Sequence, residues 1–209
     1  MIDNIDSVRE MLSFEKKGWF YFIQVIKRRK DIPDLPRDMK RISEYYIYSL
    51  KEFDEAVPKI KEEADFNNAR VYIHLRPRSA QKVALKALLL IGEYIDSEQP
   101  EASHKAYTSA CGKTPVKKVK SFLIDFDFEG NPYKLGNVCF WLTNTGVCYK
   151  VLSTYRGRHI ICTPFRLDKF NEAFPGIDVH KDSPTLLYKP NTNESRTETV
   201  RTTCEPICD

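Results

Sequence analysis

The stretch Ser121-Phe122-Leu123-Ile124-Asp125-Phe126-Asp127-Phe128-Glu129 alternates apolar and acidic residues and predicts a β-strand. Successive side chains of a strand point to opposite faces, so the apolar residues at even positions share one face. Asp125, Asp127 and Glu129 share the other face with Leu123. We expect the phenylalanine-rich face to enter a core and the second face to hold carboxylates only a few ångströms apart.

Carboxylates at such a spacing repel each other, so one of them must take up a proton or a cation must lie between them. A hard divalent cation with oxygen ligands is the usual solution, and it suits phosphate chemistry, in which metals bind the attacking and leaving oxygens. The alternative is an edge strand whose acidic face meets solvent. Residues further along the chain bear on this choice.

Size and composition indicate a globular protein with one sizeable core. The chain has 209 residues, of which 42% are hydrophobic and 30% charged, proportions that disordered chains do not have. The net charge of +4 permits a polyanionic partner without requiring one.

Nothing in the sequence indicates a membrane segment, and we expect a cytoplasmic protein. The first residues, Met1 to Asn4, are acidic, and the longest apolar run, Ala84 to Ile91, is short and interrupted by Lys86. The six cysteines include no C-x-x-C pair, so no zinc ribbon is predicted. Residues 191–209 are polar and are predicted to be a disordered tail that does not pack on the core.

The pattern of elements predicts an α+β domain with a mixed or antiparallel sheet flanked by helices. We expect one domain over 1–190, with an N-terminal part of 1–120 and an acidic core of 121–190. A hairpin is expected around Asn144-Thr145-Gly146, with a helix before this turn as the alternative. Helices are predicted at 6–28, 50–64, 79–95, 100–110 and 167–173, and further strands at 41–48, 70–75, 138–142, 147–152, 160–165 and 184–188.

Several basic residues are candidate contacts to a nucleic-acid backbone. On the strand from Arg70, alternation places Tyr72, His74 and Arg76 on the same face as Arg70, a composition suited to nucleotides. A solvent-exposed sheet face would look the same. The other candidates are Arg78, the lysine loop with Lys117 and Lys118, and the cluster Lys27 to Lys30, which would otherwise be a solvated helix end.

A second polar segment precedes an apolar strand at 160–165. Arg156, Gly157, Arg158 and His159 follow one another there, and a small residue beside arginines would let a phosphate approach the backbone and be bound bidentately. Further on, Asp178 lies between Ile177 and Val179, a carboxylate in an apolar, β-like context. A structural histidine and a turn-forming aspartate are the alternatives.

The order of these residues resembles the catalytic core of the archaeo-eukaryotic primase superfamily, which includes small primases and primase-polymerases of phages and mobile elements. The first family motif, three hydrophobic residues followed by Asp-hydrophobic-Asp, matches 122–127. The second, small-x-His, matches 157–159, and the third, hydrophobic-Asp, matches 177–178. The resemblance covers roughly residues 69–190. No zinc-binding motif or helicase domain accompanies it.

The resemblance implies template-directed nucleotidyl transfer on a primase-like core related to an RNA-recognition fold. Asp125, Asp127 and Asp178 would hold Mg²⁺ or Mn²⁺, and His159 with Arg158 would bind the phosphates of a nucleoside triphosphate, as would Arg156 and Gly157. A single-stranded DNA or RNA template and a replication protein would be the partners. Two alternatives remain: a non-catalytic nucleic-acid-binding module that uses Arg70, Arg76, Arg78 and the lysine loop, and a metal-dependent nuclease that uses the same carboxylates.

Overall fold

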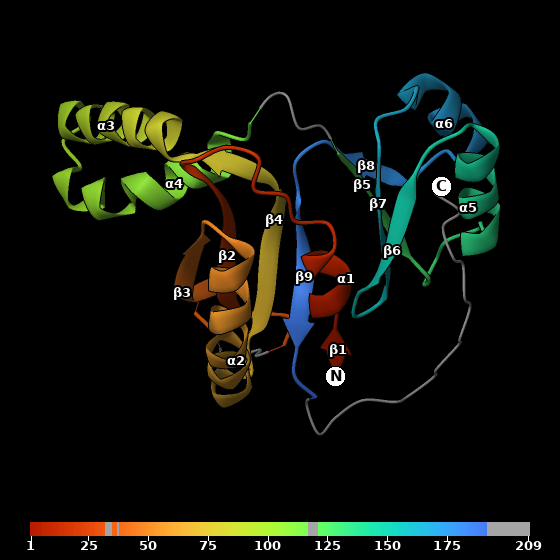
Figure 1. Ribbon diagram of the computed structural model, residues 1–209, viewed down its shortest axis with the longest axis horizontal. Helices are drawn as coiled ribbons and strands as arrows, with labels where there is room; N and C mark the ends of the chain where they lie inside the picture. The colour runs from red at the N-terminus through yellow and green to blue at the C-terminus, as the bar shows by residue number, and fades with distance from the viewer. Residues whose placement is uncertain (32–34, 37, 117–120, 192–209) are drawn as a thin grey trace.

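The computed structural model describes residues 1–31, 35–36, 38–116 and 121–191. Within them the chain forms two antiparallel sheets with helices against them, so the predicted α+β class is confirmed (Figure 1). The elements are β1 (Ile2–Asp3), α1 (Ile5–Arg9), β2 (Trp19–Arg28), β3 (Met39–Ile47), α2 (Leu50–Asn67), β4 (Arg70–Ser79), α3 (Ala80–Asp96), the 3-10 helix η1 (Pro100–Lys105), α4 (Ala106–Lys113), β5 (Phe122–Asp127), α5 (Leu135–Asn144), β6 (Tyr149–Ser153), β7 (Gly157–Cys162), α6 (Leu167–Ala173), β8 (Asp178–His180) and β9 (Pro184–Lys189).

The first sheet has the strand order β1-β9-β4-β2-β3, and β2 is buried on both of its faces. Tyr21, Ile23 and Val25 pack with α2 and α1 on one face. Phe20 and Phe22 pack with α3 and α4 on the other. A strand covered on both sides carries a continuous apolar run instead of an alternating one, which explains its composition.

The second sheet has the order β6-β7-β5-β8, with α5 and α6 on one face. Ile124 and Phe126 of β5 point into this core, whereas Leu123 belongs to the core of the first sheet. The alternation expected for β5 is therefore confirmed. In Figure 1 the two sheets lie beside each other, with α1 and β9 between β4 and β6.

The two sheets are joined by a shared core and by the buried side chain of Asn4. Its Nδ2 donates to the carbonyl oxygens of Leu186 on β9 and Ser153 on β6, both at 2.8 Å, and its Oδ1 accepts from the Ser153 N–H at 3.0 Å. Because β9 returns to the first sheet, the two parts expected on either side of residue 121 do not correspond to the two sheets.

Two predicted elements are wrong. The helix expected over 6–28 is α1 followed by β2, because the apolar run from Trp19 is a doubly buried strand. The first strand of the expected hairpin is helix α5, and Gly146, at φ +70°, follows its end, so the alternative is the correct one. The tail at 192–209 lies outside the described residues. None of the described helices is both long and apolar enough to cross a membrane.

Candidate functional site

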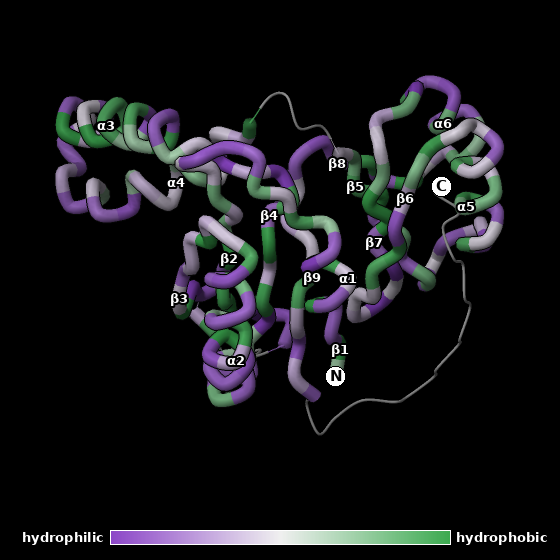
Figure 2. Tube along the Cα trace, viewed as in Figure 1, coloured by the Kyte–Doolittle hydropathy of each residue, from purple (hydrophilic) through white to green (hydrophobic). Residues whose placement is uncertain are grey.

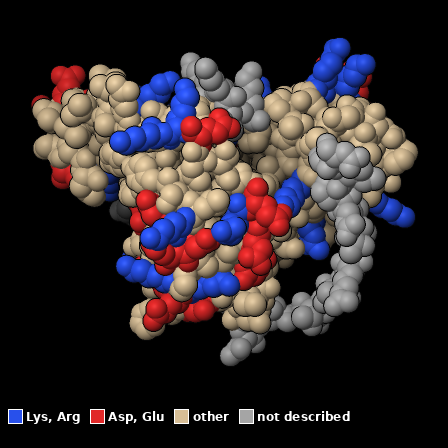
Figure 3. Space-filling view, viewed as in Figure 1, with Lys and Arg blue, Asp and Glu red and all other residues tan. Residues whose placement is uncertain are grey.

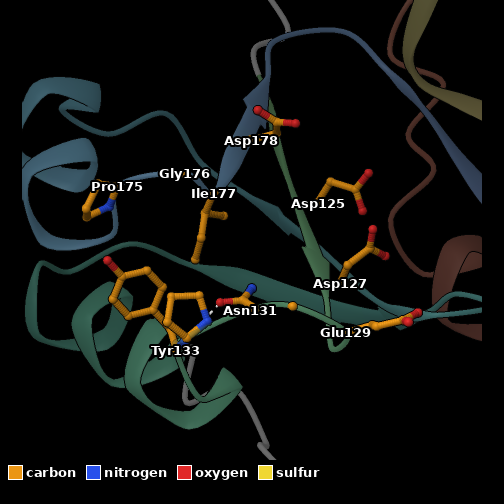
Figure 4. Close-up of a pocket in the computed structure, with 11 residues that line it drawn as sticks. Asp125, Asp127, Glu129, Asn131, Tyr133, Pro175, Gly176, Ile177 and Asp178 are labelled. Carbon is orange, nitrogen blue, oxygen red and sulfur yellow. Dashed lines mark hydrogen bonds between the residues drawn. The ribbon is translucent and has the colours of Figure 1, made fainter.

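Three predicted site residues form a row across the second sheet. Asp125 on the central strand β5 is directly opposite His159 on β7 and Asp178 on β8. Side chains at directly opposed positions of antiparallel strands point to the same face, with their Cβ atoms about 4.5–5.5 Å apart. Asp127 lies two residues further along β5 and shares this face (Figure 4). The sheet register thus brings together residues from three separate segments.

His159 is fixed between the two sheets. Its Nδ1 is 2.8 Å from the Oγ1 of Thr185, a fully buried residue of β9, and its Nε2 is 3.5 Å from the Oδ1 of Asp125. In a neutral imidazole one nitrogen donates and the other accepts. If Nε2 donates to Asp125, Nδ1 accepts the hydroxyl proton of Thr185. Both ring nitrogens therefore have a partner that orients the ring.

The electrostatic surroundings favour the ionised form of Asp125. The hydrogen bond from His159 lowers the pKa of this carboxyl group, and nearby His180 and Lys30 add to the effect, whereas partial burial opposes it. Asp125 is therefore an anion at neutral pH, as a ligand for a cation must be.

A cleft of about 340 Å³ lies between the two sheets on this face. Asp125, Asp127 and His159 line it. Basic and aromatic side chains also line it, namely Arg28, Lys30, Arg70, Tyr72, Tyr155, Arg156 and His180, together with the neutral residues Leu123, Thr154, Ser183, Pro184 and Leu186. A cleft lined by both carboxylates and cations can bind a polyanion together with a divalent cation.

A second hollow, of about 300 Å³, adjoins the same two carboxylates. Asp178, Glu129, Asn131 and Tyr133 also line it, together with the turn from Pro175 to Ile177 (Figure 4). Asp125 and Asp127 line both hollows and therefore lie where the hollows meet.

The donor types of this site fit a hard divalent cation. Carboxylate oxygens are the ligands that Mg²⁺ and Mn²⁺ prefer, and three aspartates project from adjacent strands. Among the described residues, no three Asp, Glu, His or Cys side chains are close enough together to hold a metal ion. The carboxylates are thus of the chemical type that such a cation prefers, but the described residues do not form a metal site.

Arg70 lines the cleft, although an ion pair already occupies its guanidinium. Its Nε and Nη2 donate to the carboxylate of Asp31 at 2.6 and 2.7 Å. The ring of Tyr155 lies 5.4 Å from this guanidinium and 4.7 Å from the Nζ of Lys189. Tyr155, in the turn between β6 and β7, therefore packs against cations of the first sheet.

Arg158 points away from the cleft. It is opposite Phe126, on the face of β7 that His159 does not share, and its guanidinium lies 5.2 Å from the ring of Phe128. Arg156 lines the cleft instead. Arg158 and His159 were predicted to bind the phosphates of a nucleoside triphosphate together, but they point to opposite faces of β7, as adjacent residues of a strand do.

Gly157 has a packing role that the sequence did not indicate. A Cβ at this position would lie 1.9 Å from the carbonyl oxygen of Phe126 and 2.8 Å from the Cα of Asp127. The backbone of β5 occupies the space in which a phosphate was expected. The small residue is thus required for the close approach of β7 to β5.

Two of the other predicted nucleic-acid contacts, Arg76 and Arg78, do not line the cleft. Arg78 is fully buried and donates to the carbonyl oxygen of Cys111 at 2.5 Å and to Asp182 at 3.1 Å, so its assignment as a surface contact is wrong. Arg76 donates to the backbone carbonyls of Lys181 and Val116. Lys117 and Lys118 lie outside the described residues.

Several cleft residues were not predicted as site residues. The run of cations from Lys27 to Lys30 indicated Arg28 and Lys30, but it was also compatible with a helix end. Tyr72 shares its face with Arg70 by alternation, and its hydroxyl accepts from Arg28 at 3.3 Å. No sequence pattern indicated that Thr185 belongs to the site, because its contact with His159 depends on β9 packing beside β7.

Comparison of the chain with models of known protein families, with curated proteins and with solved structures gives no match. Function is therefore inferred from the residues and geometry described above.

Proposed function

We propose that the protein is a metal-dependent nucleotidyltransferase of the archaeo-eukaryotic primase type, with its catalytic core on the second sheet. The row of His159, Asp125 and Asp178 across β7, β5 and β8 is the observation that supports the proposal most directly. The three short motifs that carried the resemblance converge on one face beside a cleft.

In this proposal Asp125, Asp127 and Asp178 would hold Mg²⁺ or Mn²⁺. The ion, when bound, neutralises phosphate charge and activates the attacking hydroxyl. His159 donates a hydrogen bond to a phosphate of the incoming nucleoside triphosphate while Thr185 keeps the ring in place. To do so, it exchanges its contact with Asp125 for one with the substrate.

Basic side chains of the cleft would supply the remaining charge compensation. Arg28, Lys30 and Arg156 line the cleft and would attract the triphosphate and the backbone of a single-stranded template. Tyr72 offers an aromatic face on which a base could stack. We also propose that the protein acts together with a replication protein.

Incorporation of labelled nucleotide on single-stranded templates, with Mn²⁺ or Mg²⁺, tests the proposal. The unmodified protein is expected to extend or synthesise a strand, and the variants Asp125→Asn and Asp178→Asn are expected to lose this activity. Asp168→Asn is the matched control, because Asp168 is exposed on α6 and pairs with Arg166. Degradation of the strand would indicate the nuclease, and binding without turnover would indicate the non-catalytic module.

A further inference from the structure

Helix α3 carries an apolar stripe that the rest of the described chain does not cover. Its buried face, with Val83, Ala87 and Leu90, packs on Phe20 and Phe22 of β2. On the opposite side Leu85, Leu88, Leu89 and Ile95 are 56–65% exposed. A helix that is apolar on two sides is normally buried on both, and a contiguous exposed stripe marks an interaction surface.

The position of α3 leaves this stripe accessible. With η1 and α4 the helix forms a lobe that projects from the first sheet, away from the second sheet (Figure 1). Apolar residues run along the helix (Figure 2). In the space-filling view the lobe is largely uncharged, with acidic side chains at its outer end (Figure 3).

The exposed positions of α3 are symmetric about the midpoint between Leu88 and Leu89. Two copies of the helix packed antiparallel about this point would place every exposed residue from 81 to 96 opposite another exposed residue. The opposed pairs are Leu88 with Leu89, Leu85 with Gly92, Ala84 with Glu93, Lys82 with Ile95 and Gln81 with Asp96.

In this arrangement a large side chain of one copy packs against a small residue of the other. Leu85 of one copy lies against Gly92 of the other, and a Cβ at Gly92 would meet no atom within 4 Å, so the space above this glycine is open. Leu88 and Leu89 meet their counterparts at the centre. Interdigitation of this kind allows two helices to approach closely.

The charges of α3 favour the antiparallel orientation. Lys82 and Lys86 lie in its first half, and Glu93 and Asp96 in its second half. Lys86 and Glu93 already pair with each other within the helix at 3.6 Å. Antiparallel packing brings Lys82 of one copy beside Asp96 of the other, whereas parallel packing would oppose like charges. The helix dipoles also oppose each other favourably.

We propose that the protein forms a two-fold symmetric dimer through antiparallel packing of α3 on α3 of a second copy. Because one helix pair is a small interface, dissociation is expected on the order of micromolar concentration. The dimer leaves the cleft of each copy open, so it does not depend on the proposed catalytic function.

Sedimentation or light scattering of the full chain, from low to high micromolar concentration, measures this association. A concentration-dependent dimer is expected, and Leu88→Glu should make it a monomer because the new carboxylates enter the apolar seam. Phe66→Glu is the matched control, because Phe66 is 90% exposed on α2, and should leave the dimer unchanged. A monomer at every concentration, or a dimer that tolerates Leu88→Glu, would overturn the proposal.

Charge reversal tests the antiparallel register. Lys82→Glu and Asp96→Lys should each weaken the dimer about two- to fivefold, and the double variant should restore it. These residues are about four turns apart on one helix and cannot contact each other within a copy. Restoration therefore requires contact between copies, and its absence would contradict the antiparallel arrangement. Circular dichroism of each variant verifies the fold.

Discussion

At Gly157 the backbone of β7 lies so close to that of β5 that only a hydrogen atom fits in place of a side chain. We expect Gly157→Ala to destabilise the protein by about 1–3 kcal/mol or more, because the new methyl group would overlap the carbonyl oxygen of Phe126. Gly112→Ala is the matched control. Gly112 lies in α4 with no atom near its missing Cβ, and this change should stabilise the helix by about 0.5–1 kcal/mol. Equal denaturation midpoints for the two variants would contradict this account.

In the proposed function, a substrate would compete with Asp125 for the ring of His159, which Thr185 also holds. His159→Ala should weaken nucleoside triphosphate binding about tenfold to a hundredfold, the loss of one charge-assisted hydrogen bond. Thr185→Val should produce a smaller loss, because it frees the ring without removing it. Calorimetric titration of both variants measures these effects. Unchanged affinity in His159→Ala, with lower stability, would assign this histidine a purely structural role.

On the scale of single elements, strand β4 holds a histidine that must stay neutral. His74 is buried and stacks on Phe22, and its Nδ1 lies 2.9 Å from the Nη2 of Arg78. Burial, followed by the charge of Arg78, lowers the pKa of His74 to about 3. Since the unfolded chain binds this proton near pH 6.5, the contribution of His74 is complete above that pH and is lost as the pH falls towards 3.

The free energy of unfolding should therefore decrease between about pH 6.5 and pH 3, by at most roughly 1.4 kcal/mol per pH unit from this group. His74→Gln keeps an acceptor for Arg78 without a titrating ring, and its slope in this range should be shallower. Urea denaturation at several pH values measures both slopes. Parallel slopes for the two proteins would show that His74 does not control the acid sensitivity.

The elements that the sequence predicted well are those in which apolar residues recur with a clear periodicity. The alternation of β5 and the helix predicted at 50–64, which is part of α2, needed no tertiary information. The Oγ of Ser49 accepts from the Glu52 N–H at 3.1 Å and caps this helix. The run from Trp19 to Arg28 was mistaken for a helix because a strand buried on both faces has no alternation. The segment 138–142, which lies in α5, was predicted as a strand because a short apolar run does not distinguish a helix from a strand.

The sequence predicted the residues of each short motif in the candidate site, but not how the motifs are arranged relative to one another. The two aspartates of β5 follow from local alternation, and their opposition to His159 and Asp178 depends on a register that only the assembled sheet defines. Alternation alone, applied to 158–159, would have excluded Arg158. The assignment of Arg78 failed because its partners, Cys111 and Asp182, are distant in sequence.

On the scale of the whole molecule, one core cluster contains side chains of both sheets, including Ile73 and Leu187 of the first and Leu123 and Ile161 of the second. The sheets should therefore unfold in a single cooperative transition. The two tryptophans report on them separately, since Trp19 lies on β2 and Trp141 on α5.

Fluorescence of the variants Trp141→Phe and Trp19→Phe should give coincident denaturation curves, once corrected for the effect of each substitution on overall stability. Asn4→Ala should lower both midpoints together, by about 1–3 kcal/mol in stability, because it leaves buried backbone groups of Ser153 and Leu186 without partners. Separate transitions would show that the sheets are independent folding units.

The pairing of β1 with β9 also determines when the molecule can fold. Ile2 is opposite Lys189, and the Asn4 side chain reaches across 182 positions to Leu186. During synthesis the first residues leave the ribosome long before β9 has been made. The segments of β1 and α1 therefore stay unpaired in the nascent chain until β9 emerges. Contacts this distant in sequence slow folding. The first sheet cannot be completed until β9 has emerged, and a chaperone that shields the early apolar strands would act in this interval.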